Sequence, residues 1–271
     1  MKTRVITAIV ALPLLLLMLL AAPKIVTVIV AGIASAIAAY EMLSGAGIVK
    51  NIRLCLYAMA SAFWCALWCG LGIGYVWLLL GILLFWVALF AEMMLSELKL
   101  PFEKVAACFV AGVLLPLLLA SLVRIFVGSE KGRILILIPF VISFMSDSGG
   151  YFAGLYFGKH KLAPLISPKK TVEGVFGGVF GAVLGMLLFC LIIHVFVRYE
   201  VNYLYAILYG SVGSAAAVFG DLCFSAIKRQ TGIKDYGKLI PGHGGILDRL
   251  DSMIVVAPLT EFLLLLLPVV V

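Results

Sequence analysis

Residues 73–91 read IGYVWLLLGILLFWVALFA, a run of nineteen residues without a charged side chain. A run of about 20 apolar residues is long enough for an α-helix to cross the hydrocarbon core of a bilayer. Similar runs recur along the whole chain of 271 residues, of which 65% are hydrophobic and only 12% are charged. Soluble domains carry about twice that charged fraction. The composition therefore predicts an all-α, polytopic integral membrane protein and argues against a soluble globular one.

The apolar runs predict about nine transmembrane helices. These helices are expected near residues 5–22, 25–48, 54–70, 73–91, 105–127, 134–157, 172–197, 202–227 and 248–268. The first is interpreted as a retained helix, because AAPK at 21–24 is a poor signal-peptide cleavage site. The sixth is expected to be broken at SDSGG (146–150), since a broken membrane helix is tolerated where it lines a cavity or packs on protein.

The basic residues predict the orientation of the chain. With nine spans and an internal N-terminus, 15 of the 20 lysines and arginines fall in inner loops and 5 fall outside. The positive-inside rule therefore favours a cytoplasmic N-terminus, with the polar loops 158–171 and 228–247 on the same side. The net charge of +7 mostly reflects this bias, with a second use possible in holding anionic lipid or a nucleotide. Nothing in the pattern indicates nucleic acid.

Polar residues divide the chain into two regions. Residues 1–130 are expected to form a scaffold with possible dimer contacts, and residues 131–271 a catalytic region. In the first region, Glu41 and Glu92 lie near helix ends and are interpreted as side chains that snorkel to water. In the second, Gly177, Gly181 and Gly185 recur every four residues, which predicts close helix packing and makes a homodimer plausible.

The six cysteines lie in or beside apolar helices and contain no CxxC pair. Disulfide and zinc interpretations are therefore weak, and we expect small buried thiols.

Asp221, Ser225, Lys228 and Arg229 form one stripe on the predicted helix 202–227 and its cytoplasmic end. An aspartate in a membrane span is unfavourable unless it faces a partner or water. Two interpretations stay open here: an internal Asp221 to Lys228 ion pair that holds the bundle together, and a functional site.

Asp248 and Asp251 open the last predicted helix and, at spacing i and i+3, would share one face. N-capping explains one of them but not a second carboxylate one turn deeper. Three clustered carboxylates, counting Asp221, repel one another unless a cation lies between them. Oxygen ligands without His or Cys favour Mg²⁺. Asp147, in the expected helix break, is a further candidate ligand or a partner of the ligands.

Two basic loops accompany these carboxylates. Ser167, Lys169, Lys170 and Thr171 suit a phosphate, although a topological positive-inside loop explains the lysines equally well. In the second loop, glycines on both sides of His243 allow backbone amides to approach an anion. Lys234, Asp235 and Lys238 of that loop are interpreted as only shaping it. Carboxylates, cations and a glycine-rich loop together indicate phosphoryl or nucleotidyl transfer.

Residues 225–251, SAIKRQTGIKDYGKLIPGHGGILDRLD, resemble the signature of the phosphatidate cytidylyltransferase family (CDP-diacylglycerol synthases). The segments SDSGGYFAG (146–154) and SPKKTVEG (167–174) are similar to that family as well. The resemblance implies transfer of a cytidylyl group from CTP to phosphatidic acid, with Mg²⁺ and a possible second cation such as K⁺. It also implies an active site facing the cytoplasm at a bacterial inner membrane.

The resemblance and the residue chemistry together assign roles. The expected catalytic residues are Asp221, Asp248, Asp251, Lys228 and His243. The expected metal ligands are Asp221, Asp248, Asp251 and Asp147. The expected substrate-binding residues are Ser167, Lys169, Lys170, Thr171, Ser225, Arg229, Gly244, Gly245 and Arg249.

Two other functions were weighed against this one. A CDP-alcohol phosphotransferase would carry an Asp-Gly-two-residues-Ala-Arg string, and no such string occurs in the sequence. A cation-coupled transporter using Asp147 and Asp221 would leave the basic glycine loop unexplained.

Overall fold

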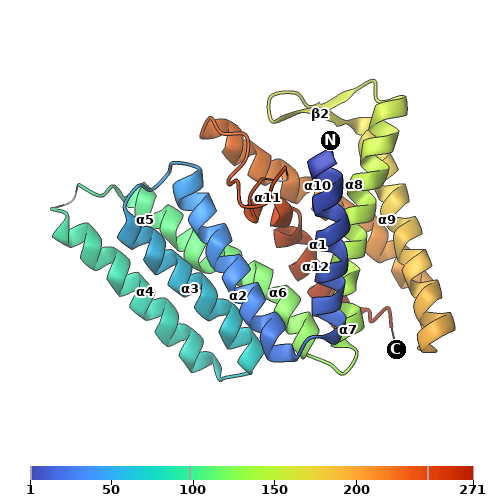
Figure 1. Cartoon of the computed structure of the whole chain (residues 1–271), viewed down its shortest axis with the longest axis horizontal. Coiled ribbons are helices and arrows are strands. Elements are labelled where there is room, and N and C mark those ends of the chain that lie inside the picture. The colour runs from blue at the N-terminus through green and yellow to red at the C-terminus, as the bar shows by residue number, and fades with distance from the viewer. Residues whose placement is uncertain (1, 98, 243, 271) are drawn as a thin grey trace. The chain divides into compact units, whose positions relative to one another are not determined.

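The computed structural model describes residues 2–97, 99–242 and 244–270, with the side chains of 2–8 and 10 excepted. Nearly all of the described chain is helical (Figure 1). Seven helical segments among the described residues are long and apolar enough to cross a membrane. They are Lys24–Gly45, Ile52–Leu71, Tyr75–Leu95, Phe102–Val127, Gly132–Phe157, Val172–Val197 and Tyr203–Gln230. The expected integral membrane protein of class all-α is thereby confirmed.

All nine predicted runs correspond to helical segments, but two fall short of a membrane span among the described residues. These are α1 (Lys2–Ala21), whose apolar described part is Ala11–Ala21, and α12 (Met253–Leu266). The other elements are α2 (Lys24–Tyr40), η1 (Glu41–Gly45), α3 (Ile52–Leu71), α4 (Tyr75–Leu95), α5 (Phe102–Phe109), η2 (Val110–Leu114), α6 (Leu115–Val127), α7 (Gly132–Leu135), α8 (Leu137–Phe157), β1 (Lys161–Ala163), β2 (Ser167–Thr171), α9 (Val172–Ile192), η3 (Ile193–Val197), α10 (Tyr203–Gln230) and α11 (Leu247–Leu250).

The chain forms two compact units, and each is discontinuous in sequence. Unit 1 contains residues 1–133 and 230–250, and unit 2 contains residues 134–229 and 251–271. The functional division into a scaffold of residues 1–130 and a catalytic region of residues 131–271 stays a prediction.

In unit 1, α3 packs against α2, α4 and α6, and Figure 1 shows α3 between α4 and α2. Small residues of α3 make this packing possible, since Ala58, Ala62 and Cys65 are completely buried. All six cysteines of the chain are free, and five of them are buried, which confirms the expectation of small buried thiols.

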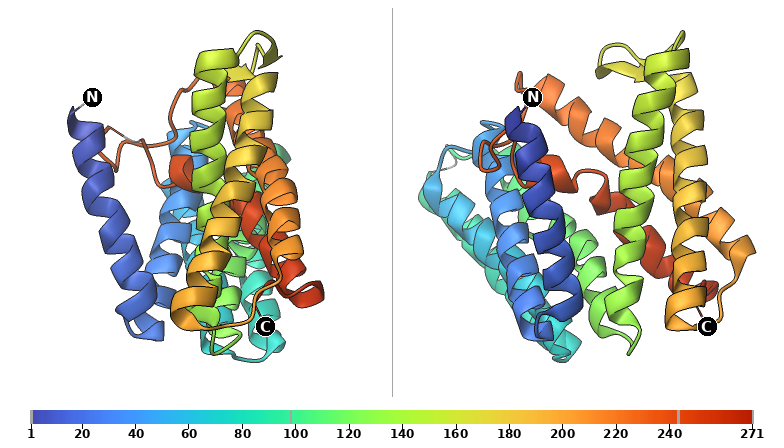
Figure 2. Two further views of the ribbon diagram at one scale, coloured as in Figure 1. Left: turned by 90° about the vertical axis from the view of Figure 1, so that its right-hand side faces the viewer. Right: turned by 45° about the vertical axis from the view of Figure 1, so that its right-hand side comes forward.

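In unit 2, α8 and α9 run alongside each other, as both views of Figure 2 show. The glycine repeat of α9 lies at this contact and confirms the predicted packing face. A Cβ atom on Gly181 would lie 2.5 Å from the carbonyl oxygen of Met145 and 3.1 Å from the Cα of Gly149. The core behind this contact contains Ile142, Met186 and other side chains of α8, α9, α10 and α12.

The expected break in the sixth helix is wrong. The helix α8 continues without interruption through Ser146–Gly150. Glycine is needed at Gly149 for a different reason, because a Cβ atom there would collide with the carbonyl oxygen of Gly177 on α9. The glycines that suggested a break therefore permit close contact between two continuous helices.

The expectation of one continuous helix over 248–268 is also wrong. The helix α11 ends at Leu250, and α12 begins at Met253 after a turn. At this turn the Asp251 side chain accepts a hydrogen bond from the backbone N–H of Ser252 at 2.8 Å. Such local bonds from aspartate to the backbone compete with the helical hydrogen-bond ladder. Asp248 and Asp251 therefore lie on different elements, not on one helical face.

Candidate active site

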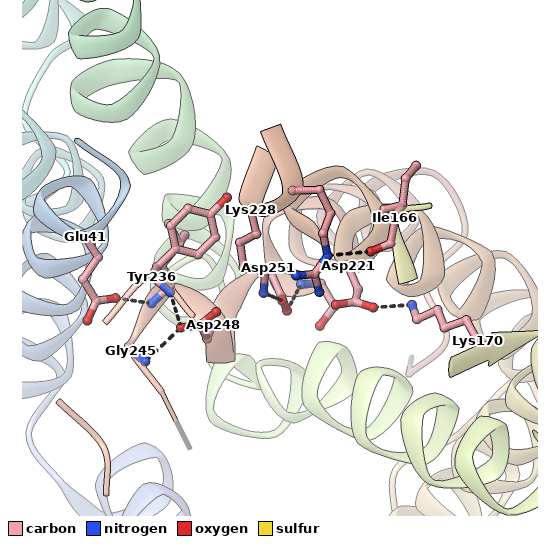
Figure 3. Close-up of polar contacts among 12 residues, drawn as sticks. Glu41, Ile166, Lys170, Asp221, Lys228, Tyr236, Gly245, Asp248 and Asp251 are labelled. Atoms are coloured by element: carbon pink, nitrogen blue, oxygen red, sulfur yellow. Dashed lines mark hydrogen bonds and ion pairs between the residues drawn. The ribbon is translucent and has the colours of Figure 1, made fainter. Parts of the chain in front are cut away.

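In unit 2, an ion pair joins the helix α10 to the hairpin of β1 and β2. The Nζ atom of Lys170 on β2 contacts Oδ2 of Asp221 on α10 (Figure 3). Both side chains are about three-quarters buried, with exposed fractions of 25% and 28%. The sequence suggested Lys228 as a partner of Asp221. The structure instead pairs Asp221 with Lys170, 51 residues earlier in the chain, and pairs Lys228 with Asp251.

A second pair of opposite charges lies on the same side of α10. Lys228 and Asp251 are both buried, and Nζ lies 3.9 Å from Oδ2 (Figure 3). Asp251 precedes α12 and lies outside the seven spans. Burial raises the pKa of its carboxyl group to about 7, and the negative charge of Asp221 adds to the rise, which Lys228 opposes. Asp251 therefore exchanges a proton near neutral pH.

Two other predicted residues of unit 2 lie near this cluster. Asp147 is exposed on α8, and its charge also contributes to the raised pKa of Asp251. Ser225 is buried on α10 one turn before Lys228. The structure thus gathers Asp147, Asp221 and Asp251 closely enough to influence one another electrostatically.

The predicted loop 158–171 is a two-stranded antiparallel hairpin, in which Ala163 pairs with Ser167. The Nε atom of Arg229 on α10 donates to the carbonyl oxygen of Ile166 at its tip, at 3.1 Å. Thr171 is buried and caps α9, where its hydroxyl oxygen accepts from the N–H of Gly174 at 3.1 Å. The structure therefore gives Thr171 a capping role, whereas Lys169 is exposed.

In unit 1, Asp248 holds the glycine-rich loop through hydrogen bonds to its backbone. Its Oδ2 atom accepts hydrogen bonds from the backbone N–H of Tyr236 at 2.8 Å and from that of Gly245 at 3.0 Å (Figure 3). Asp248 is buried, as is Tyr236, whose backbone carbonyl lies where a Cβ on Gly45 would collide with it. The N–H of Gly245 is thus satisfied within the protein, and its predicted contact with phosphate stays a prediction.

Glu41, near the N-terminal end of the sequence, binds the same loop through hydrogen bonds. It is only 5% exposed, and its carboxylate accepts hydrogen bonds from the N–H of Ile246 at 3.1 Å and of Leu247 at 2.8 Å. The interpretation of Glu41 as a snorkelling side chain is therefore wrong. Its position near a helix end gave no indication of these partners, which lie about 200 residues later in the chain.

The same loop encloses a polar cavity of about 480 Å³. Its lining residues are Lys234, Asp235, Gly237, Lys238, Ile240, Gly242, Gly244 and Arg249. Among the described residues of its lining, three side chains are basic and one is acidic, so it suits an anion. Lys234 and Lys238, which were interpreted as only shaping the loop, line this cavity. Gly244 adopts a left-handed backbone conformation, φ +85°, that favours glycine.

His243 lies outside the described residues, and its predicted role stays a prediction.

The carboxylates of unit 2 are the candidate ligands of a divalent cation. Within residues 2–97, 99–242 and 244–270, no group of three or more His, Cys, Asp or Glu side chains is gathered tightly enough to hold a metal ion. The donor chemistry of Asp147, Asp221 and Asp251 nevertheless fits a hard cation, because all their donor atoms are oxygens. Burial is the main cause of the raised pKa of Asp251, and the negative charges of Asp221 and Asp147 add to it; a bound cation would relieve this repulsion.

The fold defines an integral membrane protein, and its buried ionisable side chains are candidates for a functional site. Residues 2–267 match the model of the Cytidylyltransferase family, and the chain belongs to that family.

Several bacterial relatives carry the name phosphatidate cytidylyltransferase. The protein of Staphylococcus epidermidis is 39% identical over 136 residues, which are 50% of this chain and 51% of the relative. That of Haemophilus influenzae is 37% identical over 131 residues, 48% of this chain and 46% of the relative. That of Staphylococcus aureus is 37% identical over 136 residues, again 50% and 51%. The chain thus spans about half the length of the relatives it matches.

Proposed function

We propose that the protein is a phosphatidate cytidylyltransferase, which converts CTP and phosphatidic acid to CDP-diacylglycerol and pyrophosphate. One observation carries the proposal. In a member of the Cytidylyltransferase family, two lysines and two carboxylates of one compact unit, Lys170 with Asp221 and Lys228 with Asp251, are paired around the end of α10. Phosphate groups attract the lysines, and a divalent cation attracts the carboxylates.

The reaction needs little acid–base catalysis. The phosphate monoester of phosphatidic acid is largely dianionic at neutral pH, because its second pKa is about 6. One of its oxygens attacks the α-phosphorus of CTP, and the bond from that phosphorus to the bridging oxygen of the β-phosphate breaks. Pyrophosphate leaves with the bonding electron pair. The protein has to bring two polyanions together and neutralise their charge.

Each unit carries residues suited to part of this task, and each is taken by itself. Lys170, Lys228 and Arg229 of unit 2 would neutralise phosphate oxygens. The cavity of unit 1, with Lys234, Lys238 and Arg249, would receive the triphosphate of CTP. His243, Gly244 and Gly245 would contribute to phosphate binding, and Ser167, Lys169 and Ser225 to substrate binding, as the sequence predicts.

Mg²⁺ is part of the proposal. Asp221 and Asp251, with Asp147, would hold it, and the predicted part of Asp248 in metal binding remains to be tested. When bound, Mg²⁺ supplies charge neutralisation and polarisation of the reacting phosphate. A second cation such as K⁺, a homodimer, and an N-terminus and active site facing the cytoplasm of a bacterial inner membrane belong to the same proposal.

The test uses purified full-length protein with phosphatidic acid, Mg²⁺ and CTP labelled at either the α- or the γ-phosphorus. After solvent extraction, we expect the α-label in the lipid phase and the γ-label in aqueous pyrophosphate. Transfer of the γ-label to lipid would indicate a lipid kinase instead. Absence of both labels from the lipid, with CTP intact, would refute the proposal.

A further inference from the structure

The first turn after α2 places a carboxylate where little solvent reaches it. Glu41 opens η1, a turn of π-helix, and its side chain faces residues 245–247 (Figure 3). A buried carboxylate is unfavourable unless hydrogen bonds replace its hydration. The N–H groups of Ile246 and Leu247 provide one such bond to each of its two oxygens.

The surrounding glycines show that this contact is built into the loop. A Cβ atom on Gly245 would collide with Oε2 of Glu41 and lie 2.5 Å from its Cδ atom. A Cβ atom on Gly237 would collide with Oε1 of the same carboxylate. Two segments of the loop thus approach Glu41 more closely than any other residue type would allow at those positions.

Glu41 and Asp248 together hold three consecutive backbone amides. The N–H of Gly245 donates to Asp248, and the next two N–H groups donate to Glu41. The residue before these amides, Gly244, and the residue two positions after them, Arg249, line the polar cavity. The two carboxylates therefore fix the backbone segment between Gly244 and Arg249, the two residues that line the cavity.

We propose that Glu41 is a positioning residue for nucleotide binding, which holds the loop of residues 244–249 in the shape that receives the triphosphate of CTP. This inference rests on the proposed function. Glu41 acts through the loop and does not itself contact the nucleotide, since a carboxylate beside phosphates would repel them.

The test separates nucleotide affinity from turnover. In Glu41→Ala, we expect the KM for CTP to rise about tenfold or more, because two hydrogen bonds to a charged acceptor are lost. The KM for phosphatidic acid should stay within about twofold of wild type. Glu41→Gln keeps one acceptor oxygen and should show a smaller rise in the KM for CTP. Equilibrium dialysis with labelled CTP and no lipid should reproduce the order wild type, Gln, Ala in affinity.

Glu92→Gln is the matched control. Glu92 is also a glutamate near a helix end in unit 1, and it pairs with the exposed Arg53 at 3.5 Å. We expect this variant to bind and turn over CTP like wild type.

Three results would overturn the inference. The first is a folded Glu41→Ala protein whose KM for CTP stays within about twofold of wild type. The second is a Glu41→Ala protein in which kcat/KM falls equally for CTP and for phosphatidic acid while the affinity for CTP is unchanged. If Glu41→Ala fails to fold, Glu41→Gln provides the test. The third result is then a Glu41→Gln protein whose KM for CTP equals that of Glu92→Gln. A wild-type protein that binds CTP but makes no CDP-diacylglycerol would refute the proposed function and leave the binding test of Glu41 intact.

Discussion

Lys170 on β2 and Asp221 on α10 form an ion pair, and this pair joins the basic hairpin of β1 and β2 to the helix that carries Asp221, Ser225, Lys228 and Arg229. A lysine present only for membrane topology needs no such partner. The pairing therefore favours a functional over a purely topological interpretation of the loop 158–171.

Lys170→Ala tests that interpretation. We expect the kcat/KM for CTP and phosphatidic acid to fall about 10- to 100-fold, because a charge-assisted contact contributes about 1.5–3 kcal/mol. Lys50→Ala is the control, since Lys50 is an exposed lysine of unit 1 and should retain wild-type kinetics. An equal fall in kcat/KM in the two variants would show that Lys170 contributes to membrane topology and not to substrate binding.

Mg²⁺ binding should release a proton from Asp251. Its carboxyl pKa is raised to about 7, so the carboxylate form that binds a cation predominates above that pH and is lost below it. Calorimetry without CTP or lipid should show Mg²⁺ affinity about tenfold weaker at pH 6 than at pH 8. Asp251→Asn should abolish this dependence, and Glu130→Gln, at an exposed site, should preserve it. If wild type bound Mg²⁺ with the same affinity at both values of pH, the assignment of Asp251 as a metal ligand would be contradicted.

Chelation tests the need for a metal directly. EDTA should stop incorporation of label from CTP into lipid, and an excess of Mg²⁺ should restore it, because the two polyanionic substrates repel each other without a cation. Asp221→Ala should not recover at any Mg²⁺ concentration. Undiminished activity in EDTA would remove Mg²⁺ from the mechanism.

Gly181→Ala tests the contact between α8 and α9. The new methyl group would lie 2.5 Å from a backbone oxygen of α8, so the helices have to move apart. We expect the free energy of unfolding to fall by about 1–3 kcal/mol. Gly74→Ala is the matched control, since nothing lies within 4 Å of a Cβ atom there. Thermal unfolding in detergent compares the two, and an equal melting temperature would contradict the packing argument.

The helices could be predicted from the sequence because a membrane span depends on local composition alone. The glycine face of α9 could be predicted as well, since a repeat of four residues places Gly177, Gly181 and Gly185 on one side of a helix. The glycines of α8 led to the wrong prediction of a helix break, because Ser146–Gly150 has the composition of a break as well as that of a packing surface. Only the partner helix distinguishes the two.

The contacts of the candidate site depend on long-range partners. The hydrogen bond from Leu247 to Glu41 joins residues 206 positions apart, and no local pattern connects them. Likewise, Asp248 has the sequence position of a helix cap, yet it binds the N–H of Tyr236, twelve residues earlier. The residue types of the site could be predicted, whereas their pairing could not.

The discontinuity of both units has a consequence for biosynthesis. Unit 1 needs residues 230–250 to complete it, and unit 2 needs residues 251–271. Glu41 leaves the ribosome long before its partners Ile246 and Leu247 are made, and its burial has to wait for them. Neither unit can finish folding during translation until its late segment, 230–250 or 251–271, has been made, so a nascent protein stalled in the loop after α10 leaves both units unfinished in the membrane.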